Sequence, residues 1–94
     1  MEKKKKQKAI IIVYGKDEVG IVYNVTKILY ENNVNILNIK QTIADEYFNM
    51  MCILDVAYAK PLNKIKSDLE KYAKKGALNI NFQLEDAFTT MHVL

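Results

Sequence analysis

The chain has 94 residues, of which 50% are hydrophobic and 27% charged, and its formal net charge is +3. This length and balance fit one globular domain, and they exclude an intrinsically disordered chain or a chain with two separate cores. The first eight residues hold five lysines against one glutamate, so the rest of the chain is close to neutral. We therefore predict a disordered Lys-rich tail over 1–8 and a single domain over 9–94.

Neither a membrane span nor a signal peptide is expected. The apolar run over 9–14 is stopped by Gly15, which is short of the ~7–15 residues of a signal-peptide core and the ~20 residues of a membrane span. The sequence thus predicts a cytoplasmic protein without a membrane partner. The single cysteine, Cys52, has no second cysteine for a disulfide and lies in an apolar run, which predicts a buried, inert thiol. We expect no metal and no cofactor.

Three elements are expected in the first half of the chain. The continuous apolar run over 9–14 is typical of a central strand covered on both faces. Residues 21–32 carry apolar side chains at helical spacing and end at two asparagines, which tolerate the backbone of a helix C-terminus. Residues 34–44 read as a strand with a bulge near Leu37–Asn38, where the two-residue period breaks. The more inward set of that strand is predicted to be Val34, Ile36, Ile39, Gln41 and Ile43.

The middle of the chain predicts a hairpin and a second helix. Asp45–Glu46 form a polar turn into a strand over 47–58, whose two apolar or mixed faces indicate another central strand. Pro61 suits the first position of a helix, because its fixed φ is helical and its missing N–H is not needed there. Gly76 is the expected stop of that helix.

The strict alternation over 78–84 predicts an edge strand with one polar face. Residues 87–94 are too short to classify and are compatible with one helical turn. The order β-α-β-β-α-β predicts a ferredoxin-like α+β fold, in which two helices cover one face of a four-stranded antiparallel sheet. Tyr14, Met51 and Ile53 then fall on the helix-free face. Since exposed apolar surface usually marks an interface, we predict a homodimer.

The residue types of common catalytic sites are scarce. His92, the only histidine, lies near the end of the chain, and the adjacent acids Asp45 and Glu46 sit on a turn. No arginine is present to hold a phosphate. Tyr47 and Phe48 are aromatic as in an RNA-recognition module, but that signature also requires a basic residue and a glycine. These features predict a protein that is not an enzyme, and they argue against a nucleic-acid partner.

A short glycine-containing turn between the first strand and the first helix is the most informative stretch. Gly15 supplies a backbone that turns out of the strand, and Gly20 allows close approach of backbone or ligand because it has no Cβ. Asp17 is placed to cap the loop or the helix. The first N–H groups of a helix are unpaired and attract anions. An ordinary strand-to-helix connection would have the same glycines, so this alternative stays open.

The chain resembles an ACT domain of the small stand-alone kind found in bacteria and archaea. The resemblance covers about residues 9–94. It rests on Ile10-Ile11-Ile12-Val13, on Gly15-Lys16-Asp17-Glu18-Val19-Gly20-Ile21-Val22, on Asn35-Ile36, on the hairpin from Gln41-Thr42 to Tyr47-Phe48-Asn49-Met50, and on Met91-His92.

This resemblance implies a regulatory domain that binds a small-molecule effector, commonly an amino acid, at the interface of a homodimer. One wall of the site would be Asp17, Glu18, Val19, Gly20, Ile21 and Val22, and the other would be Asn35, Ile36 and Leu37 of the partner subunit. Backbone N–H groups would meet the ligand carboxylate, and Asp17 or Asn35 its ammonium.

Because no catalytic or DNA-binding domain accompanies these residues, the signal is expected to act in trans on an unidentified regulated protein. A protein-interaction or RNA-binding module of the same fold, without a small-molecule ligand, is the alternative.

Overall fold

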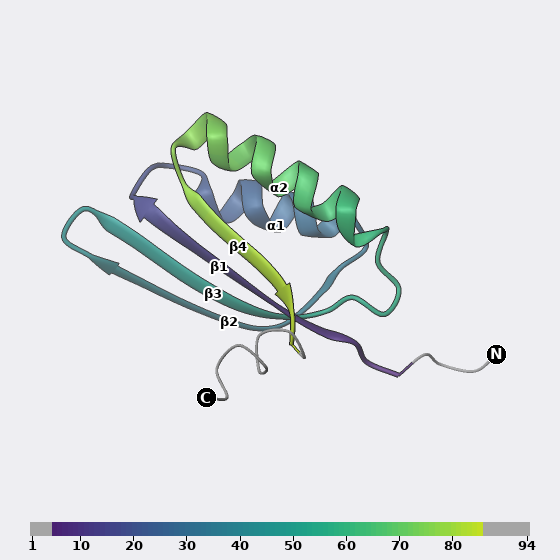
Figure 1. The fold of residues 1–94 in the computed structure, drawn as a ribbon. Coiled ribbons are helices and arrows are strands. Elements are labelled where there is room, and N and C mark those ends of the chain that lie inside the picture. The colour runs from purple at the N-terminus through teal and green to yellow at the C-terminus, as the bar shows by residue number, and fades with distance from the viewer. Residues whose placement is uncertain (1–4, 86–94) are drawn as a thin grey trace, which may run out of the picture.

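The computed structural model describes residues 5–85 as a sheet covered by two helices (Figure 1). Its elements are β1 (Lys8–Lys16), α1 (Ile21–Glu31), β2 (Asn35–Ala44), β3 (Tyr47–Asp55), α2 (Leu62–Gly76) and β4 (Asn79–Leu84). The strands are ordered β2-β3-β1-β4, and every neighbouring pair is antiparallel. Both helices lie on the same face of the sheet. The predicted ferredoxin-like α+β fold is confirmed.

The core lies between that face and the helices. In β1 and β3 every second side chain points toward the helices, and these side chains are buried. Val25 and Leu29 of α1 and Ile65 and Leu69 of α2 meet them from above. The helical and strand periods therefore place their apolar residues on one shared core, as each amphipathic pattern requires.

The folded part begins slightly earlier than position 9. Lys8 already pairs with Asp55 in the sheet, and the backbone N–H of Val56 donates to the Gln7 carbonyl at 2.8 Å. The third strand ends at Asp55 rather than at position 58, because Asp55 accepts a hydrogen bond from the N–H of Ala57 at 3.0 Å and the chain turns there. The predicted helical turn over 87–94 and His92 lie outside the described residues.

The two ends of α2 differ in detail from the prediction. Pro61 is the N-cap, with an extended ψ of 140°, so it precedes the first helical residue instead of occupying that position. At the other end Gly76 is the last residue of the helix, and Ala77 takes the left-handed conformation with φ 54°. The N–H of Leu78 donates to the Ala73 carbonyl at 2.9 Å across this turn. That hydrogen bond holds Ala77 in a conformation that glycine would adopt more easily.

The second strand, β2, lies at the edge of the sheet, and its apolar side chains are therefore less buried than the sequence pattern predicts. The predicted bulge is confirmed, since the pairing shifts between Ile36 and Asn38. Ile39 and Ile43 do face the helix side, opposite Cys52 and Phe48, yet they are 43% and 53% exposed. The alternation gives the correct face, but no helix covers this far edge of the sheet.

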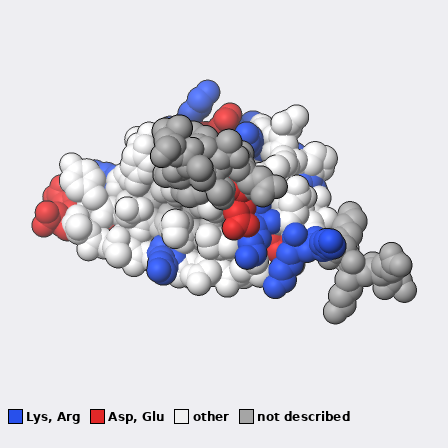
Figure 2. All heavy atoms as spheres, turned by 60° about the horizontal axis from the view of Figure 1, so that its bottom comes forward, with Lys and Arg blue, Asp and Glu red and all other residues white. Residues whose placement is uncertain are grey.

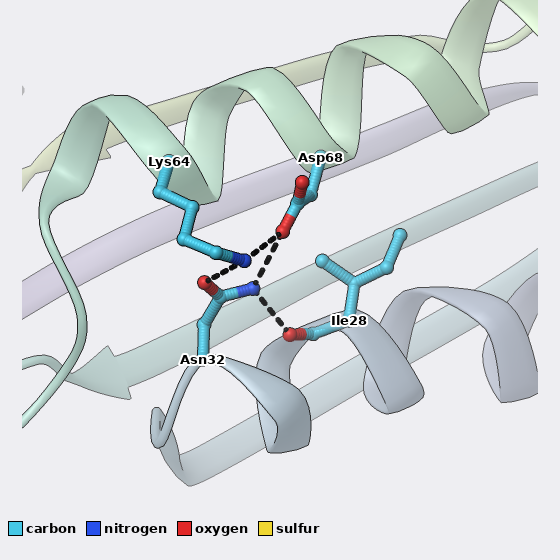
Figure 3. Close-up of polar contacts among 4 residues, drawn as sticks. All are labelled: Ile28, Asn32, Lys64 and Asp68. Carbon is cyan, nitrogen blue, oxygen red and sulfur yellow. Dashed lines mark hydrogen bonds and ion pairs between the residues drawn. The ribbon is translucent and has the colours of Figure 1, made fainter.

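A buried asparagine ties the end of α1 to α2 (Figure 3). The Asn32 side chain is fully buried. Its Nδ2 donates to the Ile28 carbonyl at 2.8 Å and to Asp68 Oδ2 at 3.1 Å. Lys64 Nζ donates to Asn32 Oδ1 at 3.3 Å and to Asp68 Oδ2 at 2.8 Å. Burial without these partners would be costly, so the network sets where α1 ends against α2.

The ion pair in this network depends on pH. The hydrogen bond from Lys64, and after it that from Asn32, holds the pKa of Asp68 below its usual value. Because the folded-state pKa is the lower one, the stabilisation is present above the unfolded-state pKa. It is lost as the pH falls through the folded-state pKa.

Replacing Asn32 tests this role. We expect Asn32→Ala to lower the free energy of unfolding by about 1–3 kcal/mol, because Asp68 and Lys64 lose a buried partner. Denaturant unfolding at neutral pH measures the change. Asn63→Ala on the exposed side of α2 is the control and should change little. Equal stability of the Asn32→Ala protein and the wild type would show that the network does not hold the helices together.

Candidate functional site

The loop between β1 and α1 lies against two neighbouring segments, the residue just before β4 and the hairpin between β2 and β3. A Cβ on Gly15 would lie 2.9 Å from Leu78 Cδ2 and 3.4 Å from Leu78 Cα, so a larger residue here would require the Leu78 side chain, just before β4, to move. The N–H of Asp17 donates to the Glu46 carbonyl at 2.7 Å, which ties the loop to the hairpin of β2 and β3. The loop is therefore positioned by backbone contacts, and its side chains stay available.

The first helix begins without a side-chain cap. Gly20 is the N-cap, in the left-handed region with φ 90°, and the first turn contains no acidic residue. Of the two caps considered for Asp17, the helix cap is not formed, and the Asp17 backbone N–H instead donates to the Glu46 carbonyl of the hairpin. Asn24, in the first turn of the helix, holds the N-cap residue, since its Nδ2 donates to the Gly20 carbonyl at 2.7 Å. The opening N–H groups of α1 thus lack a side-chain acceptor, and they carry the positive end of the helix dipole.

The predicted residues of the first wall differ in what they present. Asp17, Glu18 and Val19 are exposed. Gly20 offers backbone only, and Ile21 is buried in the core, so its side chain is turned away and only its N–H remains for a ligand. Val22 is half-buried against the core. This wall is a backbone donor site bordered by two carboxylates.

The second predicted wall lies at the other end of the molecule. Asn35 pairs with Asp55, which pairs with Lys8 at the start of β1. Asp17 follows Lys16 at the opposite end of that strand. Nine strand residues span roughly 25–30 Å. One chain therefore does not bring Asn35, Ile36 and Leu37 to the loop that carries Asp17.

Charge is concentrated around the loop. The backbone hydrogen bond from Asp17 brings Glu46 of the hairpin turn next to it, so carboxylates border the open N-terminus of α1. Tyr72 of α2 belongs to the same region. Burial raises the pKa of its phenol, a hydrogen bond with Asn24 opposes this, and the nearby Glu18 carboxylate adds to the rise. Donor N–H groups beside carboxylates suit a ligand with both signs of charge.

Sequence reasoning missed Asn24 and Tyr72. Asn24 contacts the N-cap of its own helix, one turn away, whereas its hydrogen bond with Tyr72 joins α1 to α2 and does not follow from a local pattern. The only local signal is a polar residue four positions after Gly20, which is one helical turn.

A groove of about 670 Å³ runs along the outer side of α1 and the start of β2. Tyr23 and Tyr30 are the exposed aromatic residues in it. Its lining consists of Tyr23, Thr26, Lys27, Tyr30, Glu31, Val34, Asn35 and Ile36. Further along β2, outside this groove, Ile39 and Ile43 are also exposed.

Other candidates for chemistry are weaker. Phe48 is buried on the helix side of the sheet, so it is not placed to stack on an RNA base as the strand aromatics of an RNA-recognition module do. Within residues 5–85 no three His, Cys, Asp or Glu side chains are grouped to hold a metal ion. In the same residues neither helix has the length and apolar content needed to cross a membrane.

The two glycines at helix ends offer a matched test of the N-cap geometry. We expect Gly20→Ala to destabilise the protein by about 1–2 kcal/mol, because an L-residue is strained in the left-handed region and its Cβ would lie 3.2 Å from Asn24 Nδ2. Gly76→Ala should be neutral or stabilising, since Gly76 is helical and its Cβ would meet Leu78 at ordinary distances. Thermal unfolding of both variants measures the difference. The same effect at both positions would contradict the assigned backbone.

Cys52 should not react in the folded protein. It is fully buried, and burial raises the pKa of its thiol to about 11. A thiol-specific chromogenic reagent at pH 8 should therefore label one equivalent in denaturant and almost none in the native state. Rapid labelling of the native protein would show that the β3 core is open.

Known proteins resemble the chain over nearly its whole length. Residues 7–83 match the model of the ACT domain family. A UPF0237 protein of Clostridium perfringens is 47% identical over 85 residues, which are 89% of this chain and 96% of that protein. A UPF0237 protein of Methanocaldococcus jannaschii is 40% identical over 86 residues, with 90% and 96% covered.

Among solved structures, an ACT domain protein from Streptococcus pneumoniae is 34% identical, with a TM-score of 0.76 over 89% of this chain and 96% of that one. ACT domains are regulatory domains that typically bind small-molecule effectors. The chain belongs to the ACT domain family and is similar to its small UPF0237 proteins from bacteria and archaea.

Proposed function

We propose that this protein is a cytoplasmic regulatory homodimer that binds a free amino acid between its subunits and acts in trans on another protein. The observation that carries the proposal is the separation of the two walls. The loop with Asp17 and the strand start with Asn35 lie at opposite ends of β1 in one chain. If both walls belong to one site, a second copy in the opposite orientation would supply the wall that is missing from the first.

The free edge of β2 gives a way to place that copy. An edge strand presents unpaired N–H and C=O groups, which a second strand can satisfy. Antiparallel pairing of β2 with the partner's β2 would set the end of one strand beside the start of the other. It would also bring the groove along α1 against the same groove of the partner and cover Tyr23 and Tyr30, which are exposed in the single chain.

The assembled site has the chemistry of amino-acid recognition. The uncapped N–H groups at the start of α1 favour the ligand carboxylate. The Asp17 carboxylate and the partner's Asn35 are suited to its ammonium. Val22 and the partner's Leu37 would border its side chain. No reaction is proposed at this site.

Regulation follows from the shared location of the ligand. A ligand held by both subunits stabilises the arrangement in which the two walls are closest, and it shifts the population by its differential affinity for that arrangement. A regulated protein that binds one arrangement better would then sense the amino acid.

A thermal-shift screen against the twenty standard amino acids tests the proposal. An effector at 100 times its dissociation constant adds about 2.7 kcal/mol to the native state. For a domain of this size the melting temperature should then rise by about 10 °C or more. A well-folded protein that responds to none of them would contradict amino-acid sensing and favour the alternative of a protein-interaction module.

Variants of each wall test the placement of the site. Asp17→Asn and Asn35→Ala should each reduce the shift caused by the effector, because each removes a partner of its ammonium. Glu70→Gln and Asn63→Ala are the same chemical changes at exposed positions of α2, and they should leave the shift unchanged. An undiminished shift in both wall variants would place the ligand elsewhere.

A further inference from the structure

One face of the sheet has no helix on it (Figure 1), and the centre of that face is apolar. Ile10 and Ile12 of β1 lie beside Ile53 and Met51 of β3 on this face. Ile10 is buried, whereas the other three remain partly exposed. Figure 2, in which the bottom of Figure 1 is turned forward, shows uncharged surface on this side with lysines and acids among it. An apolar centre with a polar border is the layout of a protein interface.

The outer strands supply a border made mainly of amides. The strand registers place four side chains in a row across the face: Lys40, Met51, Ile12 and Asn81. The neighbouring row is Asn38, Ile53, Ile10 and Gln83. Gln83 Oε1 is buried and accepts no hydrogen bond. This oxygen is covered by the chain itself, so the border toward a partner is formed by the exposed Asn38, Lys40 and Asn81.

We propose that a second copy of this chain packs on the helix-free face, sheet against sheet. The two-fold axis would run parallel to the strands, between β1 and β3. Each β1 then lies over the partner's β3, and each β2 lies over the partner's β4. This interface is separate from the α1 and β2 edge, and it does not rest on ligand binding.

The apolar rows are self-complementary about this axis. Ile12 and Met51 are opposite one another in one sheet, so the axis places Ile12 over the partner's Met51. In the same way Ile10 lies over the partner's Ile53. Facing sheets pack about 10 Å apart with interdigitating side chains, which lets these pairs fill the space between them.

The polar residues match as well. Lys8 is opposite Asp55 within one sheet, and the axis therefore places Lys8 over the partner's Asp55. By the same rule, Lys40 lies over the partner's Asn81. The partner's Asn38 then comes over Gln83, so amide faces amide there.

A two-fold axis that runs across the strands would instead bring like charges to face each other. It would place Lys40 against the partner's Lys40 and Lys16 against the partner's Lys8. Like charges facing each other across an interface are unfavourable. The charges thus select the axis that runs parallel to the strands.

The face is large enough for a stable contact. Four strands about 4.8 Å apart, of six to ten residues each, present roughly 500 Å² in projection, and the relief of the side chains increases the accessible area beyond this. Stable interfaces bury about 800 Å² per partner, whereas crystal-packing contacts mostly bury less than half of that.

Lysine substitutions in the centre of the face test the proposal. Sedimentation equilibrium of the full chain should show that Met51→Lys halves the mass of the assembly, because each copy would bury one lysine in the interface, which makes two per contact. Tyr14 is 49% exposed in the single chain, so Tyr14→Lys should fold and should also halve the mass. Ser67→Lys adds the same charge on the exposed side of α2, and it should keep the wild-type mass.

Circular dichroism separates loss of assembly from loss of folding. If Met51→Lys does not fold, Tyr14→Lys decides the outcome. A folded Tyr14→Lys protein with the wild-type mass would overturn the proposal and leave the face to another occupant, such as residues 86–94 of the same chain. The amino-acid response of Tyr14→Lys is measured separately. An unchanged mass overturns the sheet-face contact whether or not Tyr14→Lys still responds to the amino acid. A halved mass, with or without the amino-acid response, supports the sheet-face contact.

Discussion

The left-handed backbone at Gly20 lets α1 begin almost directly after β1, and the candidate site depends on it. A residue with a Cβ would be strained there and would press on Asn24, whose amide holds the Gly20 carbonyl. With that carbonyl occupied and no side-chain cap present, the first N–H groups of α1 are left for another acceptor. The geometry that starts the helix is thus also the geometry that can bind an anion.

The fold was largely predictable because its patterns are local. Alternation in 78–84, helical spacing in 21–32 and the broken period near Leu37 each gave the right element. The failures have tertiary causes. Ile39 and Ile43 follow the inward pattern but are exposed, since only the arrangement of the helices determines which strand edge is covered. Likewise, Ala77 takes the left-handed turn expected at Gly76 because α2 extends one residue further.

The candidate site was predictable only in part. The resemblance to ACT domains pointed to the loop and to Asn35, and the structure shows that these lie at opposite ends of β1. Strand order and register are needed to see this separation, and neither can be read from spacing. The contact between Tyr72 and Asn24 was missed for the same reason, as it joins two helices that are far apart in the sequence.

The two surfaces would have different roles. The edge formed by α1 and β2 completes the ligand site, so its geometry can respond to an effector. The helix-free face has a fixed, self-complementary pattern of apolar and amide side chains, which suits a permanent contact. Separate contacts would let one pair of subunits rearrange while the assembly stays intact.

Mixing two binding-deficient variants tests most directly whether the site is shared between subunits. Asp17→Asn and Asn35→Ala chains would be unfolded and refolded together, and effector binding would be measured by calorimetry. In a two-fold dimer half of the assemblies are mixed, and each mixed dimer contains one site with both intact walls. The account predicts recovery of about a quarter of the wild-type sites after mixing. Recovery of none, with mixed dimers shown to form, would mean that each site is built within one chain and would contradict the account.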